Sequence, residues 1–251
     1  MEKFKKWLKK RLSGDQGYRI LHLISRNPVL SFFIGVFFGR NLTKLAIINN
    51  TDKHRVGRHE YMEHYQRHFS KLKYKKNNLL EIGVGGYKRP DRGGCSLRMW
   101  KQYFPFGHIY ALDIYDKRPQ EERRIKIFKG SQIDYNFLDD ILDSIGNSID
   151  IIIDDGSHIN EHVIGSFQYL FPKLKEGGIY VVEDVQTSYR EDYGGSSTNL
   201  EEAYTMMNFF KKILDFINHD HFSPLINEDN VHYKMISSIH FYDNLIFIHK
   251  K

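Results

Sequence analysis

Residues 151–158 read Ile-Ile-Ile-Asp-Asp-Gly-Ser-His, which is the pattern of a buried strand that ends in two acidic residues. One helix-length segment later, residues 177–184 end in the same way and read Gly-Gly-Ile-Tyr-Val-Val-Glu-Asp. In an open α/β sheet, ligands bind beyond the carboxyl ends of the strands, so these polar side chains are expected to converge. The two stretches therefore predict an α/β fold with a ligand site at one edge of its sheet.

From residue 79 onward, short β-branched runs alternate with longer amphipathic segments. This alternation is typical of βαβ units and predicts a Rossmann-like, mostly parallel sheet with helices on both faces. The expected strands are Leu79–Gly83, Ile109–Asp113, Ile125–Phe128, Ile149–Asp154, Gly178–Glu183, Ser237–Tyr242 and Asn244–His249. The expected helices are Ser96–Tyr103, Tyr135–Ser144, Asn160–Leu174 and Leu200–Asn218. The last two strands are separated by a tight turn, which predicts an antiparallel C-terminal edge, and residues 187–199 are expected to form a mobile loop beside the site.

The positive charge of the chain is concentrated at its start. The net charge is +6, and residues 1–26 hold eight basic and two acidic residues, so the remaining chain is formally neutral. A nucleic-acid-binding domain usually carries a basic surface of its own, so nucleic acid is not an expected partner. Cys95 is the single cysteine, which excludes an intramolecular disulfide and makes a cytoplasmic location the default expectation.

Residues 1–50 are predicted to form a basic, aromatic helical arm on a catalytic domain of residues 51–251. The first twelve residues place apolar side chains on one helical face and lysines on the other. This pattern fits a helix on an anionic membrane surface and equally a helix docked on the protein. The apolar run at residues 28–39 is shorter than the ~20 residues that span a bilayer. The arm is therefore expected to make peripheral membrane contact through residues 1–40 or to cover the catalytic domain.

The segment Leu80-Glu81-Ile82-Gly83-Val84-Gly85-Gly86 is a strand that runs into a glycine-rich turn. The missing side chains at Gly83 and Gly85 let a ligand approach the backbone closely. The dinucleotide fingerprint requires a helix directly after its third glycine, whereas residues 87–94 intervene here, so nicotinamide binding is disfavoured. Asp113 closes the next strand and suits the hydroxyls of an adenosine ribose, with a helix cap or turn as the alternative role.

Two further polar positions follow the pattern of a nucleoside site. Ser131 and Gln132 come after the third strand, at the level where an adenine edge would lie, although Gln132 fits a surface turn equally well. Ser96 is expected to be a helix N-cap after two glycines, either as an ordinary cap or as one that also holds a carboxylate ligand.

Acidic residues gather at the ends of two neighbouring strands. Asp155, Glu183 and Asp184 are oxygen ligands of the kind that Mg²⁺ prefers. Asp154 should point to the other side of its strand and is expected to be structural. His158 follows Asp155 closely and is expected to be a general base beside the metal, while His162 is expected to have a supporting role.

Several motifs occur in the order found in one enzyme family. They are Thr51-Asp52-Lys53, His59-x-Tyr61, Tyr65-x-x-His68-Phe69, residues 80–87, Gly94-x-Ser96-Leu97-Arg98-Met99-Trp100, Ala111-Leu112-Asp113-Ile114, Asp154-Asp155-Gly156-Ser157-His158 and residues 183–189. Together they resemble the catalytic domain of macrolide sugar O-methyltransferases of the macrocin and mycinamicin type. The resemblance covers about residues 51–251.

This resemblance implies a class I methyltransferase fold that uses S-adenosylmethionine and Mg²⁺. It assigns cofactor contacts to Glu81, Gly83, Ser96, Asp113, Ser131 and Gln132, metal ligation to Asp155, Glu183 and Asp184, and the general base to His158. The family usually has an acid where Ser131 stands. The macrolide enzymes also carry an additional N-terminal domain that organises their oligomer, whereas the sequence here shows only the basic, aromatic arm. A homo-oligomer is one expectation for this chain, but the resemblance does not specify the number of subunits.

The expected reaction is methyl transfer from S-adenosylmethionine to a sugar hydroxyl. Because the arm resembles a membrane-surface helix, the first expectation for the acceptor is a cell-surface or lipid-linked glycan at the inner membrane face. The alternative acceptor is a macrolide-type secondary-metabolite sugar or another diol. An iron-dependent hydroxylase and a non-catalytic scaffold are the competing hypotheses from other classes.

Overall fold

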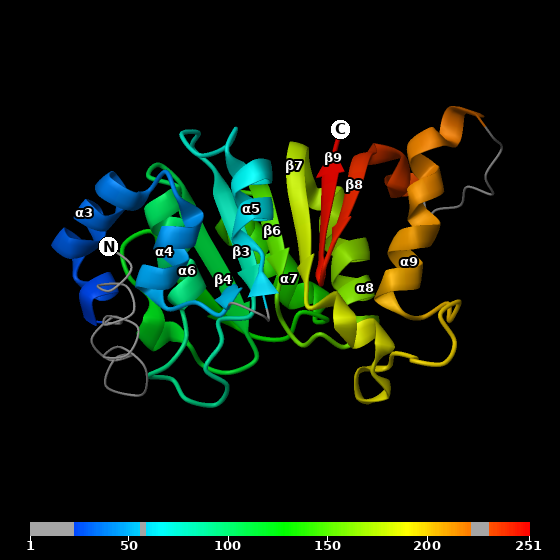
Figure 1. Ribbon diagram of the computed structural model, residues 1–251, viewed down its shortest axis with the longest axis horizontal. Helices are drawn as coiled ribbons and strands as arrows, with labels where there is room; N and C mark the ends of the chain where they lie inside the picture. Colours follow the sequence, from blue (N-terminus) through cyan, green and yellow to red (C-terminus); the bar gives the residue numbers. More distant parts are fainter. Residues whose placement is uncertain (1–22, 56–58, 222–230) are drawn as a thin grey trace.

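The computed structural model describes residues 23–55, 59–221 and 231–251 (Figure 1). Its main sheet has seven strands in the order β5-β4-β3-β6-β7-β9-β8. The five parallel strands are β3 (Asn78–Ile82), β4 (His108–Asp113), β5 (Ile125–Lys129), β6 (Ile149–Asp154) and β7 (Leu174–Glu183). The last two, β8 (Ile236–Tyr242) and β9 (Leu245–Lys250), form an antiparallel hairpin, and β9 pairs with β7. The predicted α/β fold and its antiparallel C-terminal edge are therefore confirmed.

Helices cover both faces of the sheet, because each strand of the core alternates the direction of its apolar side chains. One face carries Ile151 and Ile153 of β6 and packs against α4 (Leu42–Asn49), α5 (Met62–Phe69) and α6 (Cys95–Tyr103). The other face carries Ile152 and packs against α7 (Tyr135–Ser144), α8 (Asn160–Leu170) and α9 (Met206–Ile213).

Capping residues explain where the structure differs from the expected helix ends. The helix expected from Leu200 begins instead at Met206, because the Thr205 side chain accepts a hydrogen bond from the Asn208 amide. At its other end it passes into a 3-10 helix, Leu214–His221. The α8 helix ends at Leu170 and continues as the short 3-10 helix Phe171–Lys173. Ser96 is not the N-cap of α6, since Gly94 holds that position with a φ of 68°.

The arm contains α3 (Pro28–Phe38) and α4, which lie beside α6 at one end of the sheet (Figure 1). The helix expected in the first twelve residues lies outside the described residues. Within the part of the chain that the structure describes, no helix is long and apolar enough to cross a membrane. The proposed division at residue 50 stays a prediction, although α4 is packed into the same core as α5 and α6.

Candidate active site

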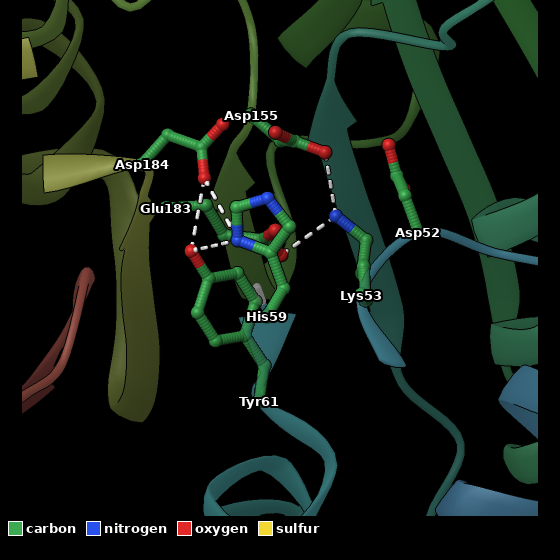
Figure 2. A pocket seen from close by; sticks show the side chains of 7 residues that line it. All are labelled: Asp52, Lys53, His59, Tyr61, Asp155, Glu183 and Asp184. Atoms are coloured by element: carbon green, nitrogen blue, oxygen red, sulfur yellow. Dashed lines mark hydrogen bonds and ion pairs between the residues drawn. The ribbon is translucent and has the colours of Figure 1, made fainter. Parts of the chain in front are cut away.

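A small pocket opens at the carboxyl ends of β6 and β7 (Figure 2). A two-stranded hairpin, β1 (His54–Arg55) and β2 (His59–Glu60), lies across these strand ends and leads into α5. The pocket is lined by Asp52, Lys53, His59, Tyr61, Asp155, Glu183 and Asp184. The site therefore combines acids from the sheet with basic and phenolic groups from the hairpin.

Lys53 is the central cation of the pocket. Its Nζ lies 2.6 Å from Asp155 Oδ2, 2.6 Å from Glu183 Oε1 and 3.2 Å from Glu81 Oε1, and its side chain is buried. Burial alone would lower the pKa of Lys53, but the charges of the surrounding carboxylates raise it well above the usual value. Lys53 therefore stays charged and offsets part of the negative charge that the sheet brings to this edge.

The buried acids have too little positive charge around them. Burial raises the pKa of Glu81 to about 7 even though Lys53 opposes the shift. Burial, followed by the charge of Asp155, also raises the pKa of Glu183. Three carboxylates contact the single Lys53 ammonium, and Asp184 lies beside them. A further cation would complement this arrangement electrostatically.

Asp184 is fixed in an uncommon backbone conformation. Its φ is 56°, in the left-handed region that non-glycine residues rarely adopt. One carboxylate oxygen, Oδ1, accepts a hydrogen bond from Tyr61 at 2.9 Å and lies 3.5 Å from His59 Nδ1. The other oxygen, Oδ2, faces His158. Backbone strain of this kind is common at functional sites, where surrounding contacts hold it in place.

His158 has the same left-handed backbone, with a φ of 58°. Its carbonyl accepts a hydrogen bond from Thr187 Oγ1 at 2.9 Å. Its Nε2 lies 3.6 Å from Asp184 Oδ2 and 3.9 Å from Asp155 Oδ1, whereas among the described residues its buried Nδ1 has no hydrogen-bond partner. His158 thus presents one ring nitrogen to the two aspartates that border the pocket.

The donor set fits a divalent cation. Asp155, His158 and Asp184 each offer a ligand atom within 4.8 Å of the other two. Glu183 lines the same pocket, but its Oε1 already accepts from Lys53 and Tyr65. Carboxylate oxygens from two strand ends are the ligands that Mg²⁺ prefers. Asp155 and Asp184 are therefore the better-placed ligands, with Glu183 deeper in the pocket.

The glycine turn after β3 packs tightly on one side and is open on the other. Gly83 has a φ of 96°, and a Cβ there would lie 2.2 Å from the Asp155 carbonyl oxygen. Gly85 has a φ of 74°, yet of the described residues nothing lies within 4 Å of its Cβ position. Asp113 connects this turn to β4, since its Oδ2 accepts from the Val84 amide at 3.0 Å. An open glycine backbone beside a carboxylate suits a nucleoside cofactor.

The remaining predicted cofactor residues lie near this turn with different partners. Glu81 is buried and accepts a hydrogen bond from Trp100 Nε1 at 3.0 Å. Burial raises its pKa, and a hydrogen bond from the Ser96 hydroxyl opposes part of that rise. Gln132 is buried: its Nε2 contacts Asp154 and Ser166, and its Oε1 accepts from the Ser157 amide. The expectation that Gln132 might be a surface turn residue is wrong.

Asp154 and Ser131 have different surroundings in the structure. Asp154 is buried on the side away from the pocket and contacts Gln132 and Tyr180, as expected for a structural acid. Ser131 is half-buried and its hydroxyl accepts from the Ile133 amide. The hydrogen bond at Ser131 neither assigns nor excludes a cofactor contact there, so that contact stays a prediction.

The segment expected to be a loop lies beside the site as two short 3-10 helices, Val185–Tyr189 and Glu191–Tyr193. Asn160 at the start of α8 connects this segment to the core. Its Nδ2 donates to the carbonyls of Thr187 and Tyr193, and its Oδ1 accepts from the Met206 amide.

Lys53, Tyr61 and Tyr65 stand within the family motifs of the sequence, but no role was predicted for them. All three precede the first core strand, so strand-end logic did not bring them into the site. The missed signal was charge balance: three acids predicted to meet at one sheet edge favour a nearby cation, and Lys53 stands in a quoted motif without another role.

Comparison with known proteins agrees with this geometry. No protein-family model matches the chain. Mycinamicin VI 2''-O-methyltransferase of Micromonospora griseorubida is 44% identical over 193 residues, which are 76% of this chain and 48% of the relative. The 8-demethyl-8-alpha-L-rhamnosyl tetracenomycin-C 2'-O-methyltransferase of Streptomyces olivaceus is 40% identical over 89% of this chain and 59% of the relative.

A solved structure is similar throughout the same region. The MycE methyltransferase of the mycinamycin pathway, in complex with Mg, SAH and mycinamycin VI, superposes with a TM-score of 0.76 at 42% identity. The match covers 84% of this chain and 54% of MycE. The sheet order and these matches define a class I methyltransferase fold. More specifically, the chain is a homologue of the macrolide and tetracenomycin sugar O-methyltransferases, and it spans about half the length of the curated relatives it matches.

Proposed function

We propose that this chain is a Mg²⁺-dependent O-methyltransferase that transfers the methyl group of S-adenosylmethionine to a sugar hydroxyl of a glycosylated small molecule. The observation that supports this most directly is that Asp155 and Asp184 line one pocket and that His158 Nε2 lies 3.6 Å from Asp184 Oδ2. The relatives named for methylation of mycinamicin and tetracenomycin sugars support the same reaction.

The proposed class of acceptor is taken from the relatives. It replaces the first expectation, a membrane-linked glycan, which was inferred from the arm. The matched proteins act, by name, on sugars of macrolide and tetracenomycin compounds. Nothing in these relatives supports a cell-surface or lipid-linked glycan. The secondary-metabolite sugar, which was the alternative, is therefore the proposed acceptor.

The residues of the pocket divide the chemistry among them. Asp155, Asp184 and Glu183 would hold Mg²⁺, which lowers the pKa of a bound hydroxyl when it is present. His158 would accept the hydroxyl proton at Nε2, the ring nitrogen that lies near Asp155 and Asp184. Lys53 keeps Asp155 and Glu183 paired and oriented. Asp113 and the open turn at Gly85 would bind the cofactor ribose.

The competing classes are less well supported. An iron oxygenase of the 2-His-1-carboxylate type needs two histidines at the metal. In the described part of the chain, the potential metal ligands that lie beside His158 are Asp155 and Asp184, not His162. The Nδ1 of His162 instead contacts Ser157 Oγ at 3.1 Å. A scaffold has no need for strained backbone at both Asp184 and His158.

Asp113→Ala should weaken S-adenosylmethionine binding by about 10–100-fold, because a hydrogen bond to a charged group contributes roughly 1.5–3 kcal/mol. Isothermal titration with the cofactor, with and without Mg²⁺, measures the change. Asp113→Asn should give a smaller loss, since it keeps an acceptor for the Val84 amide.

Asp116→Ala is the matched control, since Asp116 is nearby on the chain and its carboxylate pairs with the exposed Arg118. Its cofactor affinity should stay at the wild-type value. If wild-type protein bound no cofactor under either condition, the methyltransferase proposal would be wrong.

We also propose that the arm contacts an anionic membrane surface. The α3 helix exposes stacked Phe33 and Phe37, the latter 73% exposed, and residues 1–26 carry the whole net charge. Self-association through the same face is the alternative that would give the expected homo-oligomer.

Replacing Phe33 and Phe37 together with serine should reduce co-sedimentation with phosphatidylglycerol vesicles several-fold. Phe106→Ser, at an exposed position outside the arm, is the control. Equal sedimentation of the wild-type and doubly substituted proteins would contradict membrane contact. If the double substitution changed the molecular mass of the protein in solution without lipid, the face would be assigned to self-association.

A further inference from the structure

A second group of metal-ligating side chains lies away from the pocket. His68 near the end of α5 meets His240 of β8 and His249 of β9. His249 is paired with Ile179 of β7, whereas Glu183 of the pocket is paired with Leu245. The two groups therefore lie at levels of the sheet that are four positions apart along β7.

The three imidazoles already have the spacing of a metal site. Each offers a ring nitrogen within 4.8 Å of the other two, and all three residues are half-buried. His68 Nδ1 and His249 Nε2 are 2.8 Å apart. Tetrahedral bonds of 2.0–2.1 Å to a zinc ion require nitrogens about 3.3 Å apart, so a shift of roughly half an ångström would admit the ion.

Surrounding groups fix the orientation of two of the rings. His68 Nε2 contacts Tyr242 Oη at 3.0 Å, and His240 Nε2 contacts Ser238 Oγ at 3.1 Å. The His68 ring also stacks on Phe247 with centroids 4.1 Å apart. Metal-ligating histidines commonly use their second nitrogen in this way, which leaves the first nitrogen directed at the ion.

The chemistry of the group favours a nitrogen-binding metal over Mg²⁺. The three potential ligand atoms are all imidazole nitrogens. Imidazole nitrogen is a common ligand of zinc and similar transition metals. A set of three imidazoles does not suit a hard cation that prefers carboxylate and other oxygen ligands.

We infer that His68, His240 and His249 form a binding site for Zn²⁺ or a similar borderline transition metal, with solvent completing a tetrahedral shell. The ion would fasten α5 to the β8–β9 hairpin. It is separate from the Mg²⁺ ions and cofactor of the proposed reaction, and either proposal can fail without the other.

The test uses the full chain without a histidine tag, stripped of metal and then saturated with Mg²⁺. Titration with Co²⁺ should give one equivalent with the intense visible absorption of tetrahedral cobalt, and Zn²⁺ should abolish it. Zn²⁺ at about 100 times its dissociation constant should raise the unfolding midpoint by roughly 5–10 °C. His240→Ala should weaken binding by at least about 100-fold. His240 is suited to this test because it lies on the edge strand, outside the buried core.

Three further variants make the outcome decisive. His249→Gln should reproduce the loss, while His108→Ala, which removes an exposed histidine elsewhere, should bind like the wild type. Asp184→Asn should also retain the cobalt spectrum, since it alters only the pocket. The inference is overturned if His240→Ala and His249→Gln bind as the wild type does, if Asp184→Asn removes the signal, or if the wild-type chain shows no tetrahedral cobalt.

Discussion

His158→Asn is expected to lower kcat for sugar methylation by about 10²–10⁴-fold, the usual contribution of a general base. Asparagine is the appropriate replacement because it tolerates the left-handed backbone at φ 58° better than alanine does. The side chain loses the ring nitrogen that faces Asp155 and Asp184, while the backbone contact with Thr187 is kept. Steady-state kinetics with a glycosylated acceptor, beside cofactor titration, measures both effects.

The cofactor affinity of His158→Asn should stay near the wild-type value, because the glycine turn and Asp113 are not in contact with His158 in the described structure. His162→Ala is the matched control four residues further along the chain, in α8, where the ring contacts Ser157 Oγ. Its kcat should remain close to the wild-type value. A His158→Asn enzyme with unchanged kcat would remove the base from this residue, and a loss confined to cofactor affinity would make His158 a binding residue.

The fold could be predicted from the sequence because its strands are buried and rich in apolar residues. Runs such as Ile149–Asp154 place apolar side chains on both faces, with Ile151 and Ile153 on one and Ile152 on the other, and the structure confirms this strand with the same bounds. The ends of helices were harder to predict where a capping residue, and not the apolar pattern, set the first residue of the helix. Thr205 delayed the start of α9, and Gly94 displaced Ser96 from the cap position because its left-handed φ suits glycine.

The site was accessible in part, and the missing part has a physical reason. Asp155, Glu183 and Asp184 follow from the rule that parallel strands end at one edge, and they line one pocket. The left-handed backbones of His158 and Asp184 depend on contacts with Thr187 and with Tyr61 that no local pattern specifies. Lys53 was missed for the same reason, since it enters from a hairpin distant in sequence.

Lys53→Met is expected to lower the free energy of unfolding by about 3–5 kcal/mol in the presence of EDTA, the usual effect of removing one partner of a buried ion pair. Methionine has a similar length, so the change removes the ammonium from Asp155 and Glu183 with little loss of volume. Denaturant unfolding with the midpoint and slope both fitted measures the effect. Methyl transfer should also fall, because these acids lose the contact that orients them.

Lys175→Met is the matched control. Its ammonium pairs with Asp150 at 3.2 Å, but its side chain is 42% exposed, and exposed pairs contribute at most about 1 kcal/mol. Adding Glu183→Gln to Lys53→Met should restore part of the lost stability, since it removes one of the unpaired buried charges. Mg²⁺ should also stabilise Lys53→Met more than the wild type, because the ion then supplies these acids with the positive charge that Lys53 no longer provides. Equal stability of Lys53→Met and the wild type in EDTA would mean that the buried acids take up protons at little cost, and Lys53 would lose its proposed role in the pocket.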